Sequence, residues 1–336
     1  MTIVSFLLVM LVGFAAHRAS LCTVRAVAEV LTSGTAYMLA SFAKAAAWTV
    51  VVSGTIMFLM PGSSFPALER SPYLLALAGG VMFGAGAAVN GGCSLSTLQR
   101  LADGELGMIG TLTGFLVGAL AWSLVDLKFL HSTLHPLPYF LAPGREGSGW
   151  VLAGLWIWAL WELFRLWHAS DHATGFRHRI LAGTYRLSAA AAILGVAGGI
   201  LYKLQGPWTY TNFLRAEAGS WRGVVAKPAL IQGGLLVALL GGMLLSSLQR
   251  GSFSLRREWR PDLGKRLSGG FLMGVASANI PGGNDTLILT AIPTLSISAI
   301  GTYAAVIAGI MLVLVGMRVI GGSVPRVQCA GDRCIS

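Results

Sequence analysis

The chain has 336 residues, 55% of them hydrophobic and 11% charged, with a mean hydropathy of +0.71 and a formal net charge of +11. A soluble domain carries about 25% charged residues, so this composition excludes a soluble protein and indicates a chain that crosses a membrane many times. The cations gather in short loops, which ties the positive charge to membrane orientation and argues against a nucleic-acid partner.

Nine apolar runs of spanning or near-spanning length follow one another along the chain. The first run lacks the basic stretch of a signal peptide, so we expect a mature membrane segment there. Several runs are shorter than the ~20 residues that cross the hydrocarbon core, and polar or glycine-rich breaks follow them. We predict an all-α polytopic membrane protein with about nine transmembrane helices and about four short re-entrant helices. The runs are 3–16, 36–60, 73–89, 105–125, 149–169, 187–205, 224–248, 267–280 and 296–318.

Three basic segments predict the orientation of the chain. They are the loops 170–186 and 249–266 and the tail that carries Arg318, Arg326 and Arg333. With nine crossings all three segments lie on one side. Short loops rich in Lys and Arg remain in the cytoplasm. We therefore expect the N-terminus outside the cell and the C-terminus in the cytoplasm.

The two halves of the chain repeat one another in their glycine pattern. An offset of 190 residues aligns the first glycines of the series, and an offset of 191, after a one-residue insertion, aligns the rest. Four spans in each half and one between them set the second half upside down, and inverted repeats place a transport site at their interface. The aligned positions are Gly79, Gly80 and Gly84 with Gly269, Gly270 and Gly274, then Gly91 and Gly92 with Gly282 and Gly283, and Ile109–Thr111 with Ile300–Thr302.

We expect a single membrane domain over residues 1–336. No phosphate-binding loop, dinucleotide fingerprint or Ser-His-acid set occurs, so we predict no enzyme, no cofactor and no nucleotide-driven transport. The histidines are scattered through loops and helix ends, which argues against a metal site. The parts of the domain are repeat 1 at about 3–125, a linking helix at about 149–169, repeat 2 at about 187–318 and a cytoplasmic tail at 319–336.

Two glycine pairs interrupt apolar runs at matching places in the two halves. In a bilayer, irregular backbone persists only where protein buries it or where it lines a wet cavity. The N-terminus of a helix that restarts after such a break offers free N–H groups and a partial positive charge, which attract anions. Two half-helices with their positive ends at the bilayer centre predict a passage for a small anion. The candidate residues are Gly91, Gly92, Cys93, Ser94, Gly282, Gly283, Asn284, Asp285 and Thr286.

Cys93 opens the helix that follows the first glycine pair. A thiol is a weak, polarizable donor, which suits a soft sulfur atom better than a hard phosphate oxygen. The alternative interpretation is a small buried residue with no role in binding. Asp285 starts the second short helix and is most simply its N-cap, although it could also repel anions or relay protons.

Cys22 lies directly after the first short run, between Arg18 and Arg25. Cations here are costly in contact with lipid, so we expect them to line a cavity or an interface. They could draw an anion inward and favour the thiolate of Cys22. The alternative is an interfacial segment whose arginines extend to the headgroups.

Cys329 and Cys334 sit in the polar tail at a spacing that matches no common redox or zinc motif. In a cytoplasmic tail we expect no permanent disulfide, and we interpret the two residues as an exposed pair of thiols. A role in receiving sulfur and a regulatory disulfide are the alternatives.

Several of these motifs occur in one order that resembles the YeeE/YedE sulfur-transport family. The similarity extends over about 10–318 and rests on the duplicated architecture and on Arg18 to Cys22, Gly-Gly-Cys93, Arg100 and Gly104. The resemblance implies a bacterial inner-membrane thiosulfate uptake protein, hourglass-shaped, with spanning and short helices. It implies that Cys22 and Cys93 contact the ion through transient S–H···S hydrogen bonds. It also implies a small cytoplasmic sulfur-carrier protein as a partner.

The chain departs from that family at the second break. Members carry a third path cysteine there, where this chain has Gly283, Asn284 and Asp285. The offset of 191 pairs Cys93 with Asn284. The transported species could therefore be sulfite, a persulfide-like species or a selenium compound instead of thiosulfate. A membrane thiol oxidoreductase is the alternative from another functional class.

Overall fold

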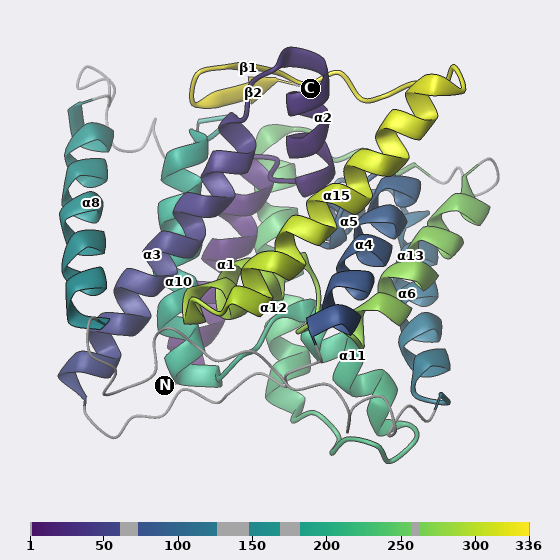
Figure 1. The fold of residues 1–336 in the computed structure, drawn as a ribbon, viewed down its shortest axis with the longest axis horizontal. Coiled ribbons are helices and arrows are strands. Elements are labelled where there is room, and N and C mark those ends of the chain that lie inside the picture. The colour runs from purple at the N-terminus through teal and green to yellow at the C-terminus, as the bar shows by residue number, and fades with distance from the viewer. Residues whose placement is uncertain (1, 61–72, 126–147, 169–181, 257–261, 336) are drawn as a thin grey trace.

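The computed structural model describes residues 2–60, 73–125, 148–168, 182–256 and 262–335. Parts of the two basic loops predicted to face the cytoplasm, 169–181 and 257–261, lie outside the described residues. The described chain is a bundle of helices, with a small hairpin of two strands close to its C-terminal end (Figure 1).

Nine helices of 15 to 23 residues make up the bundle in the described part of the chain, and each coincides with a predicted apolar run. Seven helical stretches have the length and apolarity that crossing a membrane requires, whereas α6 and α13 have 15 residues each. The chain is therefore an all-α polytopic membrane protein, and the count of nine crossings stays a prediction. The helices are α1 (Thr2–Arg18), α3 (Tyr37–Leu59), α4 (Tyr73–Asn90), α6 (Met108–Trp122), α8 (Ser148–His168), α10 (Leu187–Gln205), α12 (Leu230–Arg250), α13 (Leu263–Ser277) and α15 (Ile297–Val319).

Short helices follow the breaks in both halves. Their re-entrant placement in a bilayer stays a prediction. In the second half, the single turn of α14 continues directly into a π-helical and a 3₁₀ segment, η1 and η2. The short elements are α2 (Thr23–Ser33), α5 (Ser94–Ala102), α11 (Tyr210–Ser220), α14 (Asn284–Thr286), η1 (Leu287–Ala291) and η2 (Ile292–Thr294).

Helices of the two halves pack on one another with their roles exchanged. In one region α1 packs on α12 while α10 packs on α3, and in the other α4 packs on α15 while α13 packs on α6. The short helices follow the same rule, since α2 contacts α15 and α11 contacts α6. Between these pairs, α1 meets α10 and α4 meets α13. This exchange is the packing that a two-fold relation between repeats predicts.

Glycines at matched positions of the two halves lie at these helix contacts. A methyl group on Gly84 of α4 would overlap the carbonyl oxygen of Val306 on α15, and one on Gly274 of α13 would overlap that of Phe115 on α6. These two contacts are related by the offsets of 190 and 191 that the sequence shows. Small residues let helix backbones approach closely in membranes. The repeated glycines therefore mark matching sites of close helix packing.

The starts of the two short helices give an offset that differs by one residue from the offset of the glycine pairs. Cys93 is the N-cap of α5 and Gly283 is the N-cap of α14, so the starts of the two short helices align at 190, whereas the left-handed glycines Gly91 and Gly282 before them align at 191. In the second half the π-helix Leu287–Ala291 follows this start, whereas α5 continues as an α-helix through Ala102. The sequence alignment paired Cys93 with Asn284. By helix position, Asn284 instead corresponds to Ser94.

The polar tail forms a hairpin closed by a disulfide. Strands β1 (Gln328–Ala330) and β2 (Arg333–Ile335) pair antiparallel, with Cys329 directly opposite Cys334, and the two sulfurs are bonded. The expectation of a free pair is therefore wrong. Spacing alone could not show this, because the pairing depends on a tight turn that places the two side chains opposite one another.

The hairpin is attached to the ends of two helices. The carbonyl and carboxylate oxygens of Asp332 accept hydrogen bonds from the N–H groups of Leu187 and Ser188 at 2.8 and 2.9 Å, which caps the start of α10. The hydroxyl of Ser33, at the end of α2, donates to the carbonyl of Val327. The tail is thus part of the folded body.

Candidate substrate path

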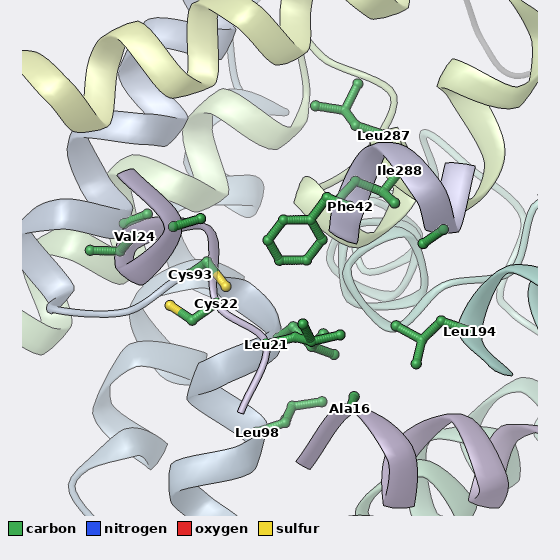
Figure 2. Packing of buried hydrophobic residues seen from close by; sticks show 14 of the residues in the cluster. Ala16, Leu21, Cys22, Val24, Phe42, Cys93, Leu98, Leu194, Leu287 and Ile288 are labelled. Atoms are coloured by element: carbon green, nitrogen blue, oxygen red, sulfur yellow. The ribbon is translucent and has the colours of Figure 1, made fainter. Parts of the chain in front are cut away.

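The structure brings the two predicted path cysteines together. Cys22 and Cys93 are the N-cap residues of α2 and α5, both are free thiols, and each is 1% exposed. Their side chains lie beside one another, and apolar side chains of the same buried cluster, Leu21 and Phe42 among them, lie around them (Figure 2). The thiols therefore occupy a site from which bulk water is excluded, where interactions with charge are stronger than in water.

Hydrogen bonds attach the first turn of α5 to the segment before α2. The Cys22 thiol donates to the Ser96 hydroxyl at 3.3 Å, and Ser96 donates to the carbonyl of Cys93 at 3.0 Å. The Gln99 amide donates to the carbonyl of Leu21 at 3.1 Å. Neither α2 nor α5 has a side-chain cap on its N-terminal N–H groups. Uncapped N–H groups and thiols therefore converge at one place.

The second break forms a hydrogen-bonded cluster with α11. Thr211 donates its hydroxyl to the Asp285 carboxylate at 2.6 Å and receives a hydrogen bond from the Gly283 N–H at 2.9 Å. The hydroxyls of Thr209 and Thr286 are also hydrogen-bonded. The expectation that Asp285 is the N-cap of its own short helix is wrong, because Gly283 holds that position and Asp285 instead accepts the N–H of Thr211 at the start of α11. The predicted residues of this break are thus together, but their polar groups bind each other.

Asn284 connects the second break to the segment of Cys22. Its amide nitrogen donates to the Thr23 hydroxyl at 2.6 Å, and Thr23 directly follows Cys22. The amide oxygen of Asn284 is buried and has no hydrogen-bond partner. An unpartnered buried oxygen requires an explanation such as a water or a ligand group nearby. Asn284 is therefore one point where the two halves of the candidate path meet.

The positive ends of the two half-helices differ in their surroundings. On the thiol side the N-termini of α2 and α5 have no side-chain cap, whereas α11 is capped by Thr209 and the single turn of α14 carries Asp285. Anions are favoured at uncapped N-termini and disfavoured beside a carboxylate. The attraction for an anion is therefore concentrated on the thiol side.

The two predicted arginines, Arg18 and Arg25, differ in the groups that they contact. Arg18 is buried, and it donates to the carbonyl of Ala182 at 2.6 Å and to the side chain of Gln249 at 3.0 Å. Arg18 thus joins α1 to α12 and to the segment before α10. Arg25 and Arg250 instead both contact Ser20 in the loop before Cys22, at 3.5 and 3.4 Å.

Several residues near the thiols were not among the predicted path residues. Tyr210 and Tyr303 are close enough to interact electrostatically with Cys93. Tyr210 opens α11, and Tyr303 lies on α15. The sequence carries one signal for them, since Tyr210 begins the short helix that is the counterpart of the one after Cys22. The approach of Arg250 to Ser20 had no such signal.

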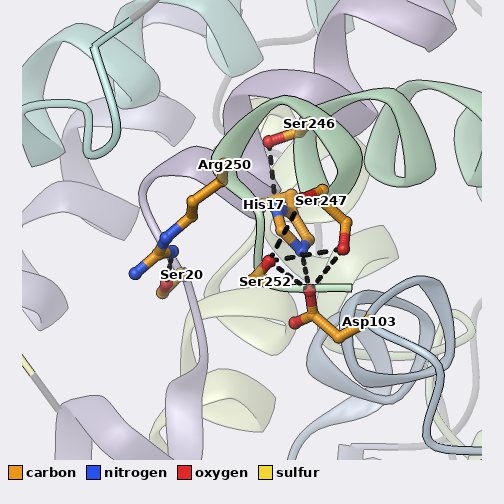
Figure 3. Close-up of polar contacts among 7 residues, drawn as sticks. All are labelled: His17, Ser20, Asp103, Ser246, Ser247, Arg250 and Ser252. Carbon is orange, nitrogen blue, oxygen red and sulfur yellow. Dashed lines mark hydrogen bonds and ion pairs between the residues drawn. The ribbon is translucent and has the colours of Figure 1, made fainter. Parts of the chain in front are cut away.

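A buried histidine joins three helix ends beside the path. His17 Nε2 contacts the Asp103 carboxylate at 3.1 Å, and His17 Nδ1 contacts the Ser246 hydroxyl at 2.9 Å (Figure 3). Ser247 and Ser252 donate to the same carboxylate oxygen at 2.7 and 2.6 Å. Burial raises the pKa of the Asp103 carboxyl, but hydrogen bonds from His17, Ser252 and Ser247 outweigh burial and lower it to about 2. This network fastens the ends of α1, α5 and α12.

The described residues contain one cluster of three side chains of the kinds that bind metal ions, and all three already bond to other protein groups. Glu29 lies near Cys329 and Cys334. Both sulfurs are in the disulfide, and the Glu29 carboxylate accepts the N–H groups of Tyr37 and Met38, each at 2.9 Å. These three side chains therefore form a structural contact between α2, α3 and the tail.

The fold and the site define a multi-pass helical membrane protein with a buried pair of thiols at helix N-termini. The family described as sulphur transport matches residues 18–312, and the chain belongs to this family, as the YeeE/YedE resemblance predicts. The thiosulfate transporter TsuA of Spirochaeta thermophila is 25% identical over 320 residues, which cover 86% of this chain and 91% of that protein.

Proposed function

We propose that the chain is a permease for thiosulfate or a related small sulfur-containing anion, and that the ion passes between Cys22 and Cys93. The observation that carries this proposal is the pair of free, buried thiols at the uncapped N-termini of α2 and α5. The helix ends supply partial positive charge, and the thiols supply weak donors that suit sulfur.

The path extends from the thiols to Asn284, where the proposal departs from a relay of three thiols. An amide offers a fixed donor and acceptor in place of a third sulfur. The unpartnered oxygen of Asn284 and its bond to Thr23 support a role at this point. Gly91, Gly92 and Ser94 on one side and Gly282 and Gly283 on the other form the backbone of the constriction in this proposal.

The proposal includes two inverted repeats that meet at the path. The exchanged helix contacts and the matched glycines support this relation. The basic residues at the end of α12 and the start of α13 support an orientation with the C-terminus in the cytoplasm, whereas the Cys329–Cys334 disulfide of the tail is the observation that opposes it. We place the protein in a bacterial inner membrane, with a small cytoplasmic sulfur-carrier protein as the acceptor of the cargo.

Uptake of labelled thiosulfate tests the proposal in a strain that lacks other routes for sulfur. We expect Cys93→Ala to abolish uptake, and Cys22→Ala to do the same or nearly so. The control is the double variant C329S/C334S, which removes the two other cysteines of the chain and leaves the path intact. Normal uptake by a well-expressed Cys93→Ala protein would contradict a path through the thiols. Labelled sulfite and selenite in the same assay identify the preferred species.

A membrane thiol oxidoreductase is the second candidate, because the two free thiols lie beside one another. Such an enzyme cycles between the dithiol and a Cys22–Cys93 disulfide, whereas a permease works with both thiols reduced. Trapping of thiols with an alkylating reagent during turnover distinguishes the two. Accumulation of an intramolecular disulfide that depends on substrate would favour the oxidoreductase.

A further inference from the structure

A basic cavity lies apart from the thiols, where the C-terminal end of α8 meets the tail hairpin. Its volume is about 410 Å³. Two of its arginines belong to helix ends, Arg165 to α8 and Arg186 to the N-cap of α10, and the third, Arg333, belongs to β2. The lining residues are Arg165, Leu166, Arg186, Ala330, Asp332 and Arg333.

The charge of this cavity favours an anion. Its lining carries three arginines and one aspartate, a formal net charge of +2. Asp332 already accepts the N–H and the hydroxyl of Ser188, at 2.9 and 2.8 Å. Arg165 contacts Glu162 and Ser188 through one terminal nitrogen, at 2.7 and 3.0 Å, and a guanidinium has five donors in all. Donors of Arg165 therefore remain for a further acceptor.

The position of the cavity indicates where an anion would come from. The last two turns of α8, which also carry Arg165 and Leu166 of the cavity, expose Trp161, Phe164 and Trp167, with 57%, 62% and 68% of each residue exposed. Exposed apolar and aromatic side chains at the end of a membrane helix are typical of the level of the lipid headgroups. Arginine binds phosphate and sulfate groups through paired N–H donors.

We propose that this cavity binds a tetrahedral oxyanion of the phosphate or sulfate type, with the phosphate of an anionic phospholipid as its first source. The hairpin supplies Ala330, Asp332 and Arg333, and the Cys329–Cys334 disulfide closes that hairpin. The site is therefore complete only when the tail is folded against α10. Nothing in the path chemistry of Cys22 and Cys93 depends on it.

Native mass spectrometry of the purified full-length protein tests the site, with phosphatidylglycerol or phosphatidylcholine added in detergent. We expect one retained phosphatidylglycerol and none of the neutral lipid. Each arginine near a membrane surface contributes about 1 kcal/mol, so R186Q/R333Q should bind roughly thirtyfold more weakly. The matched control is R318Q/R326Q, which removes two cations from the same end of the chain outside the cavity. Reduction of the disulfide should also weaken binding.

Inorganic phosphate and sulfate, each added at millimolar concentration, separate the two sources. Thermal stabilisation of the wild type by these ions, absent from R186Q/R333Q, supports a site for the free ion. Retention of phosphatidylglycerol that resists them supports the lipid headgroup. Equal lipid retention and equal stabilisation in the wild type and R186Q/R333Q would overturn the proposal. An equal loss in R318Q/R326Q would overturn it too, because the effect would then reflect net charge alone.

Discussion

The side-chain amide of Asn284 donates a hydrogen bond of 2.6 Å to the hydroxyl of Thr23, across 261 residues of sequence. Thr23 follows Cys22, and Asn284 follows the N-cap of α14, so this bond joins the second break to the segment of Cys22. It also places an amide, and no thiol, at one point where the two halves of the proposed path meet.

Asn284→Asp should abolish uptake, because a second carboxylate beside Asp285 repels a dianion in a site with little water. Asn284→Ala should retain partial uptake, since it removes one hydrogen bond worth about 1 kcal/mol and adds no charge. Initial rates of labelled thiosulfate uptake measure both effects. Asn212→Asp adds the same charge on α11 and serves as the control. Uptake by Asn284→Asp at the wild-type rate would remove Asn284 from the path.

Thr211→Val should destabilise the protein by about 1.5–3 kcal/mol, because the buried Asp285 carboxylate then loses its hydroxyl donor at 2.6 Å. Thr290→Val is the matched change, since the Thr290 hydroxyl donates only to a helix carbonyl, that of Thr286. Denaturant unfolding in detergent measures the difference. Equal stability of the two variants would show that the Asp285 cluster is not tightly coupled.

Gly84→Ala and Gly274→Ala should each cost about 1–3 kcal/mol, because the new methyl group overlaps the carbonyl oxygen of the facing helix. The two costs should be similar, since the two contacts are equivalent in the proposed repeats. Gly241→Ala has no atom within 4 Å of the new methyl group, so it should be neutral or slightly stabilising. Thermal unfolding of the three variants provides the comparison. A large cost at only one of the two packed glycines would argue against equivalent packing.

Asp103→Asn should lower stability at neutral pH and lose its effect in acid. The folded-state pKa of this carboxyl is lowered from 3.8 to about 2, so its contribution is present above pH 4 and disappears as the pH falls through about 2. A third of the side chain is exposed, and screening by solvent reduces the contribution to about 1 kcal/mol. Unfolding midpoints of the wild type and the variant at pH 7, 5, 4 and 3 should converge toward the lowest pH. A gap that widens toward acid would reverse the sign and refute this account.

The helices and their breaks followed from the sequence because the signals for them are local. An apolar run ends at a glycine pair, and the next helix starts at a residue such as Cys93, whichever other segments lie nearby. The glycine offsets were also visible, since they repeat a packing requirement. The resemblance to the sulfur-transport family then indicated which two cysteines to compare.

Only the tertiary structure decided which of these residues meet. Cys22 and Cys93 become neighbours through the packing of segments far apart in the chain, and no local sequence pattern predicts that they are neighbours. The same holds for Arg18, whose hydrogen bonds to Ala182 and Gln249 join α1 to α12 and to the segment before α10. The π-helix after Thr286 likewise depends on how a helix turn fits its neighbours. Hydropathy determines where helices form, whereas complementary shapes and partnered polar groups determine what they bring together.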